Sequence, residues 1–557
     1  MNPSGIIDLV PADVRRQWIQ NGIYPNKSVY TLFQDHAQDH PDNAAVMSLD
    51  QIVSYAALLD KTQRLATSFK ELGIVAGDVI AYQLPNSWHS CAIDLAAAAL
   101  GAIVAPFPPG RGRLDIESLL KRCHTRMIIV ERENANTDLC ELIESLRPTL
   151  LSLRTLIVDG EAKEGWHTLH SLFQAKPIQT RDLPQVSPDS PVRFLVSSGT
   201  ESEPKWVAYS HNALMGGRGR FLQRIHPDGE TFRGLYLMPL GTAFGSTATF
   251  GVLSWLGGSI VVMRQFEVAI AIEAIGKLKP THIFGVPTMF QRMAADPALL
   301  KTDTSSLIAI ISGGAKIDEA SIYRSTEAFR CNFIGLYGSA DGVNCHTTLH
   351  DDLPTAINKA GQPNPEICSI RIVDEQRQEV TQGHIGEIAA RGPISPMQYV
   401  NAPDLDVLYR DKDGWVYTGD LGFIDDDGYL VLAGRKKDII IRGGVNISPA
   451  QIENIAASHS AVVSAACIPV PDPDLGHRIC LCLVLREDKE YLSLSQLTHY
   501  LHEQGLETNK LPEYLRYYKQ LPLSPAGKID KKQLTAELAL ITQHITRHHL
   551  SEASANV

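Results

Sequence analysis

Hydroxyl side chains, one glycine and one lysine follow a short apolar run in the segment from Phe194 to His211. The run ending at Val196 predicts a buried strand. Hydroxyls and backbone N–H groups beside a lysine suit a bound polyphosphate. A polar strand-to-strand turn with a solvated lysine remains open as the alternative. The residues that would form the phosphate site are Ser197, Ser198, Gly199, Thr200, Ser202 and Lys205.

The same segment does not match a Walker A loop. Counted from Gly199, the residues Pro204, Lys205 and Trp206 stand where that motif requires Gly, Lys and Ser or Thr. A P-loop that begins a helix is therefore disfavoured.

Size and composition indicate a large protein that handles small molecules. The chain has 557 residues, 44% of them hydrophobic, which predicts two or three domains. A formal charge of −11 offers no basic field for nucleic acid and no polybasic signal for anionic membranes. No segment has the length and apolarity that predict secretion or membrane insertion. The nine cysteines include no C-x-x-C pair, which predicts reduced thiols in a cytoplasm rather than zinc or disulfides.

Short apolar runs alternate with helix-like stretches, as in 79–84, the Ala-rich 91–100 and 103–106. Strands separated by helices in this way predict an α/β fold with mostly parallel sheets covered on both faces. Past Asp420 the pattern changes to hairpins, with the turn dipeptide Asp427-Gly428 between two strands.

The change of pattern predicts two domains. We expect a large N-terminal domain, residues 1–433, with mixed parallel sheets flanked by helices, and a small mobile α+β C-terminal domain, residues 434–557. In the second domain we expect helices from 449 and over 494–503, and strands over 461–471 and 479–486.

Four further segments accompany the opening loop in a fixed order, and a fifth lies near the end of the chain. They read ISGGAKI, GLYGSADG, VYTGD, GRKKDIIIRGGVNISPAQIE and PAGKIDKK, and they begin at Ile311, Gly335, Val416, Gly434 and Pro525. Together they resemble the adenylate-forming superfamily of acyl-CoA synthetases, aryl-acid ligases, peptide-synthetase adenylation domains and luciferases. The resemblance covers nearly the whole chain, and it implies ATP, Mg²⁺ and a thiol acceptor.

The resemblance assigns roles to individual residues. Asp341 would hold Mg²⁺ beside the ATP phosphates, although an Asp in such a run is more often a turn former. Asp420, which ends a strand-like run, would accept hydrogen bonds from the ribose hydroxyls, and Arg435 would bind ribose or phosphate. The wall around adenine and the acyl group would comprise Gly313, Gly314, Ala315, Tyr337, Gly338, Ser339 and Ala340.

The C-terminal segments would serve two successive steps. Lys528 would stabilise the charge that develops when a carboxylate attacks the α-phosphorus of ATP, and pyrophosphate would leave into the Lys205 loop. Lys437 occupies the hinge position of the family. Rotation there would move Lys528 away and bring Gly443 and Gly444 in, where they would leave room for a pantetheine arm.

Several residues depart from the family pattern. Glu201, Ser202 and Trp206 replace residues of the usual phosphate loop, and a carboxylate beside pyrophosphate is unfavourable unless it points away or toward Mg²⁺. The order Ala340, Asp341, Gly342 resembles aryl-acid ligases and favours an aromatic or cyclic acid. In the substrate channel Thr242 and Phe244 stand near the position where many relatives have a histidine.

The resemblance predicts a ligase that forms an acyl-adenylate and transfers the acyl group to a thiol, with CoA as the preferred acceptor. A separate carrier protein with a phosphopantetheine arm is the first alternative; no fused carrier is expected, since a polar tail follows Lys528. A non-catalytic adenylate-binding protein is an alternative of another class.

Overall fold

The chain, seen as a computed structural model, divides into two compact units. The first comprises Met1–Arg371, Ala389–Thr418 and Asp426–Leu430, and the second comprises Ile372–Ile388, Gly419–Asp425 and Val431–Val557. The predicted boundary between 433 and 434 stays a prediction. The residues that the structure describes are 5–134, 137–161, 163–197, 204–227, 229–313, 319–442, 445–486, 491–523 and 529–538.

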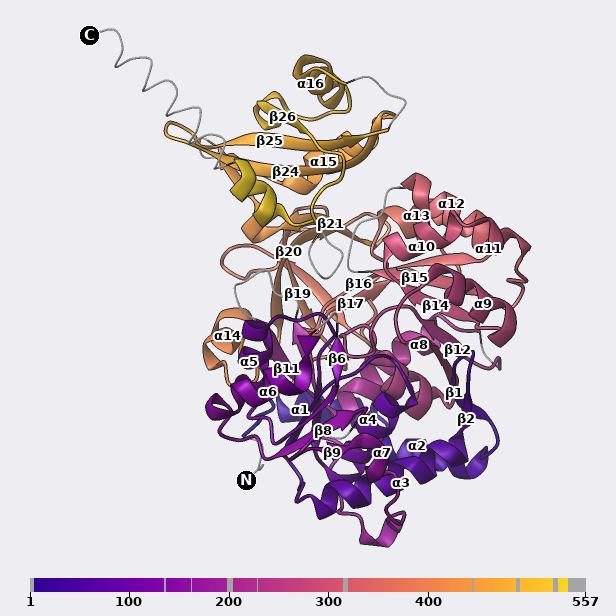
Figure 1. Cartoon of the computed structure of the whole chain (residues 1–557). Helices are drawn as coiled ribbons and strands as arrows, with labels where there is room; N and C mark the ends of the chain where they lie inside the picture. The colour runs from indigo at the N-terminus through magenta and orange to yellow at the C-terminus, as the bar shows by residue number, and fades with distance from the viewer. Residues whose placement is uncertain are drawn as a thin grey trace, which may run out of the picture. The chain divides into compact units, whose positions relative to one another are not determined.

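Two mixed sheets form the framework of the first unit (Figure 1). Their orders are β17-β16-β15-β14-β12-β13-β1-β2 and β11-β10-β4-β3-β5-β8-β9. Most neighbours are parallel, while β1/β2, β10/β11 and β16/β17 are antiparallel. The predicted α/β class is therefore confirmed.

The strands of the first sheet are β1 (Ala44–Met47), β2 (Ile52–Ser54), β12 (Arg233–Tyr236), β13 (Ser259–Val262), β14 (His282–Gly285), β15 (Ala309–Gly313), β16 (Asn332–Gly338) and β17 (Asn344–His346). Those of the second sheet are β3 (Val79–Gln83), β4 (Ile103–Pro106), β5 (Met127–Glu131), β8 (Thr155–Asp159), β9 (His167–Thr168), β10 (Pro191–Ser197) and β11 (Lys205–Ser210).

Helices lie between the two sheets and outside each of them, which explains the continuous apolar runs of the strands. In β3, Ile80 and Tyr82 join the central core, whereas Val79 and Ala81 join the core on the opposite face. The central helices are α2 (Val29–Asp39), α3 (Tyr55–Glu71) and α4 (Trp88–Leu100), and the outer ones include α5 (Arg113–Arg122), α6 (Leu139–Leu146), α9 (Val268–Leu278), α10 (Pro287–Ala294) and α12 (Glu319–Phe329).

Two wide π-helical segments also contribute to the central core. They are η3 (Ala213–Gly219) and η4 (Ala248–Leu256), and each is almost entirely buried. Such i→i+5 segments are rare and occur often at functional sites.

A four-stranded sheet has the order β18-β19-β20-β21. Its strands are β18 (Ser369–Val373), β19 (Gly386–Arg391), β20 (Val416–Ile424) and β21 (Leu430–Arg435). The predicted turn at Asp427-Gly428 joins β20 to β21, and Gly428 has the positive φ of 82° that favours glycine. The prediction that Asp420 ends a strand is wrong, because β20 continues four residues beyond it as the neighbour of β21.

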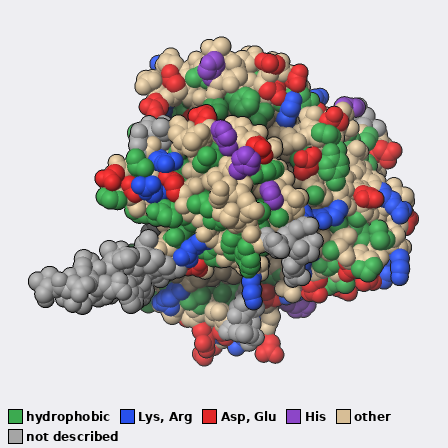
Figure 2. All heavy atoms as spheres, turned by 90° about the horizontal axis from the view of Figure 1, so that it is seen from above, with side chains coloured by type: hydrophobic (Ala, Val, Ile, Leu, Met, Phe, Trp, Pro, Cys, Tyr) green, Lys and Arg blue, Asp and Glu red, His purple; other side chains and the backbone are tan. Residues whose placement is uncertain are grey.

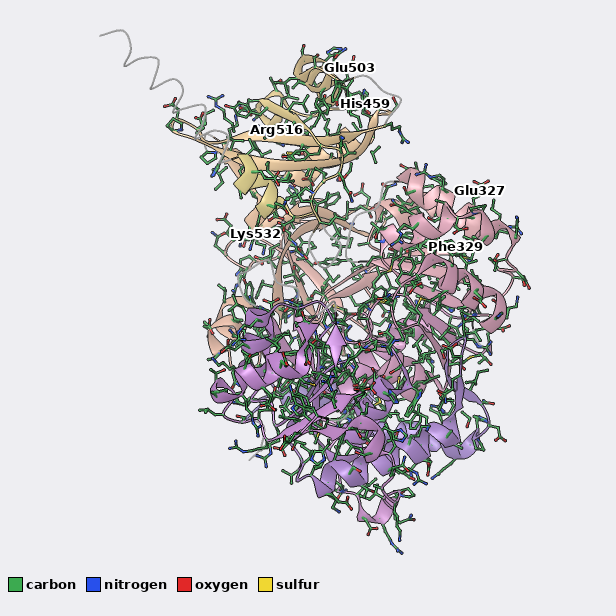
Figure 3. All side chains as sticks on the ribbon, in the orientation of Figure 1. Glu327, Phe329, His459, Glu503, Arg516 and Lys532 are labelled. Carbon is green, nitrogen blue, oxygen red and sulfur yellow. The ribbon has the colours of Figure 1, made fainter. Side chains whose placement is uncertain are left out.

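The second unit contains a five-stranded sheet with two helices packed on one face and the helical segment 531–538 packed on the other. Its strands are β22 (Ile440–Arg442), β23 (Val445–Ile447), β24 (Val462–Asp472), β25 (Gly476–Leu485) and β26 (Tyr514–Tyr517), and its helices include α15 (Pro449–Ala457) and α16 (Leu494–Glu503). His459 packs edge-on against Tyr500 of α16, with ring centroids 4.6 Å apart, and Glu503 lies at the end of the same helix (Figure 3). The predicted α+β character is confirmed.

Basic and acidic side chains are interspersed on the face of the molecule drawn in Figure 2. Among the described side chains in this view, no continuous basic field is visible. Within the described ranges, none of the helices is both long and apolar enough to cross a membrane.

Candidate active site

Two of the phosphate-loop candidates lie at the ends of two antiparallel strands. Ser197 ends β10 and pairs with Lys205, which begins β11. A strand follows the loop where a P-loop would have a helix, in agreement with the mismatch to the Walker A motif. Four candidates lie outside the described residues, namely Ser198, Gly199, Thr200 and Ser202. Glu201 also lies outside them.

Lys205 and Trp206 occupy very different surroundings on β11. The Lys205 ammonium lies 5.0 Å from the ring centroid of Tyr409. The Trp206 side chain is fully buried, packs near Phe107, and donates its indole N–H to the Leu119 carbonyl at 2.9 Å. Trp206 therefore belongs to the core, which explains how the strand tolerates its bulk beside the loop.

A second group of candidates lies at the ends of β15 and β16. Gly313 ends β15, where an added Cβ would come 2.5 Å from the Leu336 carbonyl oxygen, so the close approach of the strands requires glycine. Tyr337 and Gly338 end the neighbouring β16. Gly314 and Ala315 lie outside the described residues.

The turn after β16 carries Asp341. The Asp341 backbone N–H donates to Ser339 Oγ at 3.1 Å, and the buried Ala340 offers its carbonyl to the Tyr209 hydroxyl at 2.7 Å. The Asp341 carboxylate accepts a hydrogen bond from the Tyr399 hydroxyl at 2.8 Å. Asp341 is thus both a turn residue and an oriented carboxylate.

Tyr399 connects Asp341 to β11, the strand that begins with Lys205. No motif in the sequence pointed to Tyr399. It forms a bridge with Val207 of β11 and packs 6.1 Å from Tyr409, the ring beside Lys205. Burial and the nearby Asp341 charge raise the pKa of the Tyr399 hydroxyl far above its ordinary range, so it remains a donor. Lys205, Tyr409, Tyr399 and Asp341 therefore form one continuous arrangement in the first unit.

The backbone of Tyr399 is itself held by a buried ion pair. Its N–H donates to both oxygens of Asp406 at 3.1 and 3.2 Å, and Asp406 pairs with Arg410 at 3.0 Å. The Arg410 guanidinium lies 5.5 Å from the Tyr399 ring centroid. These contacts restrict the position from which the Tyr399 hydroxyl reaches Asp341.

The substrate-pocket candidates lie on a turn after β12. Thr242 Oγ1 donates to the Pro239 carbonyl at 2.8 Å and accepts the Gly245 N–H at 3.0 Å. Phe244 is half-buried, with its ring edge-on to Phe284 at 5.7 Å. Thr242 thus stabilises the turn, and part of the Phe244 ring belongs to the core.

A buried network fixes the backbone just before this turn. Arg193 of β10 pairs with Asp94 at 2.8 Å and donates to the Leu240 carbonyl at 2.7 Å. Asn86 accepts the Leu240 N–H at 2.8 Å and donates to the Met238 carbonyl at 2.9 Å. The strand that leads to the phosphate loop thus also anchors the substrate turn.

The ribose candidates lie in the second unit and contact each other. Arg435 Nε, at the end of β21, lies 2.8 Å from Asp420 Oδ1 within β20. Glu387, which the sequence did not single out, accepts the Gly419 N–H at 3.0 Å and pairs with Lys436 at 3.1 Å. The structure therefore brings Asp420 and Arg435 together, as one shared nucleotide contact would require.

The remaining candidates are the hinge, the thiol-tunnel glycines and the catalytic lysine, and most of them lie outside the described residues. Lys437 lies in a short 3-10 segment, Lys436–Asp438. Gly443, Gly444 and Lys528 lie outside the described residues.

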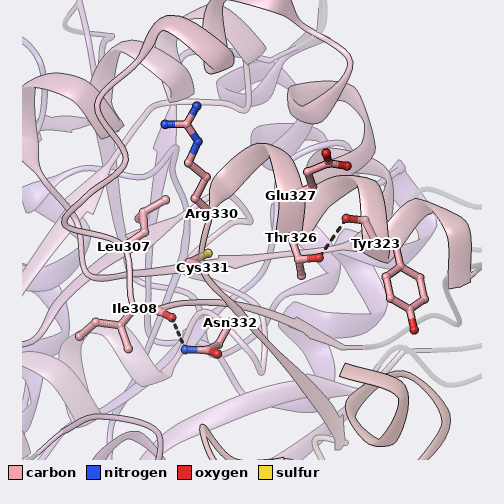
Figure 4. Close-up of a pocket in the computed structure, with 8 residues that line it drawn as sticks. All are labelled: Leu307, Ile308, Tyr323, Thr326, Glu327, Arg330, Cys331 and Asn332. Carbon is pink, nitrogen blue, oxygen red and sulfur yellow. Dashed lines mark hydrogen bonds between the residues drawn. The ribbon is translucent and has the colours of Figure 1, made fainter. Parts of the chain in front are cut away.

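A cavity of about 740 Å³ elsewhere in the first unit contains none of the candidate residues (Figure 4). Burial raises the pKa of its one thiol, Cys331, to about 12, so the thiol is protonated and a poor nucleophile at neutral pH. The residues that line it are Leu307, Ile308, Tyr323, Thr326, Glu327, Arg330, Cys331 and Asn332.

The chain is thus a two-unit α/β protein. The arrangement of Lys205, Tyr409, Tyr399 and Asp341 lies in the first unit, and the Asp420–Arg435 pair lies in the second. The sequence profile of the AMP-binding enzyme family matches residues 33–400, and the profile of the AMP-binding enzyme C-terminal domain matches residues 451–528. The chain belongs to the AMP-binding enzyme family. It is an AMP-forming ligase that uses ATP to activate a carboxylic acid.

Named relatives span nearly the whole chain. The vibriobactin-specific 2,3-dihydroxybenzoate-AMP ligase of Vibrio cholerae is 28% identical over 94% of this chain and 96% of its own. The medium-chain fatty-acid–CoA ligase of Escherichia coli is 27% identical over 94% and 93%. The crystal structure of the anthranilate CoA ligase AuaEII with anthranoyl-AMP has the same fold, with a TM-score of 0.81, 22% identity, and 93% and 98% coverage.

Proposed function

We propose that the acid is aromatic or cyclic and that its acyl group passes from the adenylate to the thiol of CoA. The arrangement of Lys205, Tyr409, Tyr399 and Asp341 carries the proposal, because it links a phosphate-loop cation to the carboxylate that directly follows the acyl wall. The relative in Vibrio cholerae, named for 2,3-dihydroxybenzoate, and the motif around Asp341 support an aromatic acid. The relative in Escherichia coli supports CoA.

In the first step the chain's own groups bind the reactants and stabilise charge. Lys528 is the candidate catalytic residue, because an ammonium at the α-phosphate stabilises the transition state more than the ground state. The loop from Ser197 to Lys205 would take the departing pyrophosphate. Thr242 and Phe244 would line the acid site, beside the wall formed by Gly313 and its neighbours.

The Asp341 carboxylate fits Mg²⁺ in its chemistry. Mg²⁺ prefers oxygen donors and commonly binds one or two carboxylates together with substrate phosphates. A single carboxylate beside the ATP phosphates would therefore suit this ion. When bound there, the ion would neutralise phosphate charge, while Tyr399 holds one oxygen of Asp341 in place.

Asp420 and Arg435 would bind the ribose together. A carboxylate has two oxygens and several lone pairs, so Asp420 can hold Arg435 and still accept ribose hydroxyls. In the second step, rotation at Lys437 would replace Lys528 by Gly443 and Gly444. The nine free thiols support the predicted cytoplasmic location.

The proposal is tested by pyrophosphate exchange into ATP with a panel of aromatic, cyclic and fatty acids. The best acid is then offered with ATP to CoA or to a pantetheinylated carrier protein. We expect exchange to be fastest with an aromatic or cyclic acid and a thioester to form on CoA. Fastest exchange with linear fatty acids would overturn the substrate class, and a thioester on the carrier alone would overturn the acceptor.

A further inference from the structure

Arg218 lies in the π-helix η3 on a backbone that is packed tightly against its neighbours. A Cβ on Gly217 would come 2.3 Å from Ile394 Cα, and a Cβ on Gly219 would come 2.5 Å from the Trp255 ring. Both flanking residues must therefore be glycine for the helix to approach this closely. This packing fixes the point from which the Arg218 side chain extends.

The Arg218 guanidinium joins two segments that carry candidate acid-binding residues. Nη1 donates to the Ala243 carbonyl at 3.0 Å, between Thr242 and Phe244. Nη2 reaches the Ser339 carbonyl at 3.5 Å and the Tyr209 hydroxyl at 3.4 Å. The guanidinium therefore lies beside both the substrate turn and the acyl wall.

The charge of Arg218 is balanced differently from that of the other buried arginines. Arg15, Arg193 and Arg410 each have a carboxylate partner within 3.0 Å. Arg218 is 7% exposed, its partners are two carbonyls and a hydroxyl, and no carboxylate of the described residues lies within ion-pair distance. Its Nε–H is buried and has no hydrogen-bond acceptor among the residues that the structure describes.

An arginine remains protonated in proteins, so this buried charge is incompletely compensated. A ligand oxygen that approached the guanidinium would supply the missing acceptor. The neighbouring segments allow access, because residues 241–244 are partly exposed and residues 335–339 are partly or fully exposed. An acid bound against these segments would reach Arg218.

We propose that Arg218 determines acid specificity by binding an oxygen acceptor on the acid other than its reacting carboxylate. The substrate class is then a hydroxy acid or a dicarboxylic acid. This inference rests on the proposed function, since it needs an acid bound at the Thr242 turn and the Ser339 wall. The relative named for 2,3-dihydroxybenzoate has such oxygen groups on its named acid, and the inference adds the residue of this chain that would bind one of them.

The test compares acids that differ only in the second oxygen group. Pyrophosphate exchange is measured with benzoate, the three hydroxybenzoates and the three benzenedicarboxylates, for the wild type and Arg218→Met. We expect kcat/KM for the best substituted acid to exceed that for benzoate by at least about tenfold, as a charge-assisted hydrogen bond would give. In Arg218→Met this ratio should fall toward one.

Arg220, two residues on, provides the matched control. Arg220 contacts Glu366 at 3.4 Å and the Gly22 carbonyl at 2.8 Å. Neither partner belongs to the candidate acid-binding segments. Arg220→Met should keep the wild-type ratio. If Arg218→Met does not fold, Arg218→Lys keeps a charge but loses the planar fork and Nε, and it must still lower the ratio.

The outcomes separate this inference from the proposed function. Exchange with no acid at all would contradict the proposed function itself. Exchange in which benzoate equals or exceeds every substituted acid, or in which Arg218→Met lowers all acids by one common factor, would overturn the role of Arg218 alone. The better of the hydroxy and carboxy series identifies which oxygen group Arg218 binds.

Discussion

Asp341 and Asp420 are candidate ligand-binding carboxylates, one in each unit, and their surroundings differ. Asp341 accepts from Tyr399, whose backbone is in turn bound to the buried Asp406–Arg410 pair. Asp420 pairs with Arg435, and their side chains are 13% and 40% exposed. A buried hydrogen-bond network orients a group before the ligand arrives, whereas a partly exposed ion pair is screened and weak. The first unit is therefore preorganised, and the second can adjust to the nucleotide.

The largest expected effect concerns pH and the buried polar groups of the first unit. Burial lowers the pKa of His211 and His282 to about 3 and that of His346 to about 4. Their unfolded forms bind a proton below about pH 6.5. The stability that these histidines contribute is therefore complete above that pH and is lost as pH falls toward the folded pKa values, by about 1.4 kcal/mol per pH unit for each histidine.

Urea unfolding followed by tryptophan fluorescence measures the free energy of unfolding of the first unit at each pH, because all six tryptophans lie in that unit. We expect the free energy of unfolding to fall by several kcal/mol between pH 7 and pH 5. His346→Gln should reduce that slope, and the exposed control His499→Gln should not. A free energy that is constant over this range would contradict the assignment.

Lys528→Ala should give the next largest effect and tests whether one lysine serves only the first step. We expect exchange to fall by roughly 10²- to 10³-fold, as for loss of one group that stabilises transition-state charge. Thioester formation from a preformed adenylate should persist. Lys532→Ala is the matched control, and an equal loss of both steps in Lys528→Ala would contradict the separate role.

Asp420→Ala probes the adjustable site of the second unit. Loss of charge-assisted hydrogen bonds to ribose should weaken ATP binding by roughly 1.5–3 kcal/mol. Direct titration with ATP measures the affinity, and Asp420→Asn should retain part of it. An unchanged affinity would remove Asp420 from the nucleotide site.

Tyr399→Phe probes the preorganised site of the first unit. Removal of one hydroxyl leaves the ring packing in place but frees the Asp341 oxygen, so we expect kcat/KM for ATP to fall about tenfold. The dependence on Mg²⁺ concentration should shift to higher values. Tyr491→Phe, at an exposed ring, is the control, and an unaltered Mg²⁺ dependence would show that Tyr399 does not orient Asp341.

The smallest effect is expected at the pair of Lys436 and Glu387, in which the Lys436 side chain is 53% exposed and the Glu387 side chain 12%. Lys436→Met should change the free energy of unfolding by less than about 1 kcal/mol, because partly exposed ion pairs contribute little. Chemical denaturation followed by circular dichroism measures it. A loss of several kcal/mol would mean that the second unit is as rigidly held as the first.

The local elements were largely predictable from the sequence. The strand over 103–106 and the helix over 494–503 have the predicted bounds, because apolar periodicity and end signals are local properties. Ser493 shows this directly, since it caps α16 in a capping box with Gln496. The place of Asp420 within β20 was mispredicted, because a strand neighbour rather than the local residues decides where β20 ends.

The partners of the candidate residues were not predictable. Tyr399 lies 58 residues from Asp341, and Glu387 lies 32 residues from Gly419. Neither belongs to a segment that the motifs of the sequence singled out. Arg218 shows the same limit, since its partners at 209, 243 and 339 come from three separate segments.

The sequence by itself determined the residue types that carry the chemistry, because these stand in short motifs. It also determined the α/β class, because that class follows from the spacing of apolar residues. Tertiary structure alone decided that Trp206 is a core residue and that Tyr399 orients Asp341. It also decided that Arg218 lies beside the Thr242 turn, with no carboxylate partner among the described residues. Burial and long-range hydrogen bonds set these roles, and both depend on residues far apart in the chain.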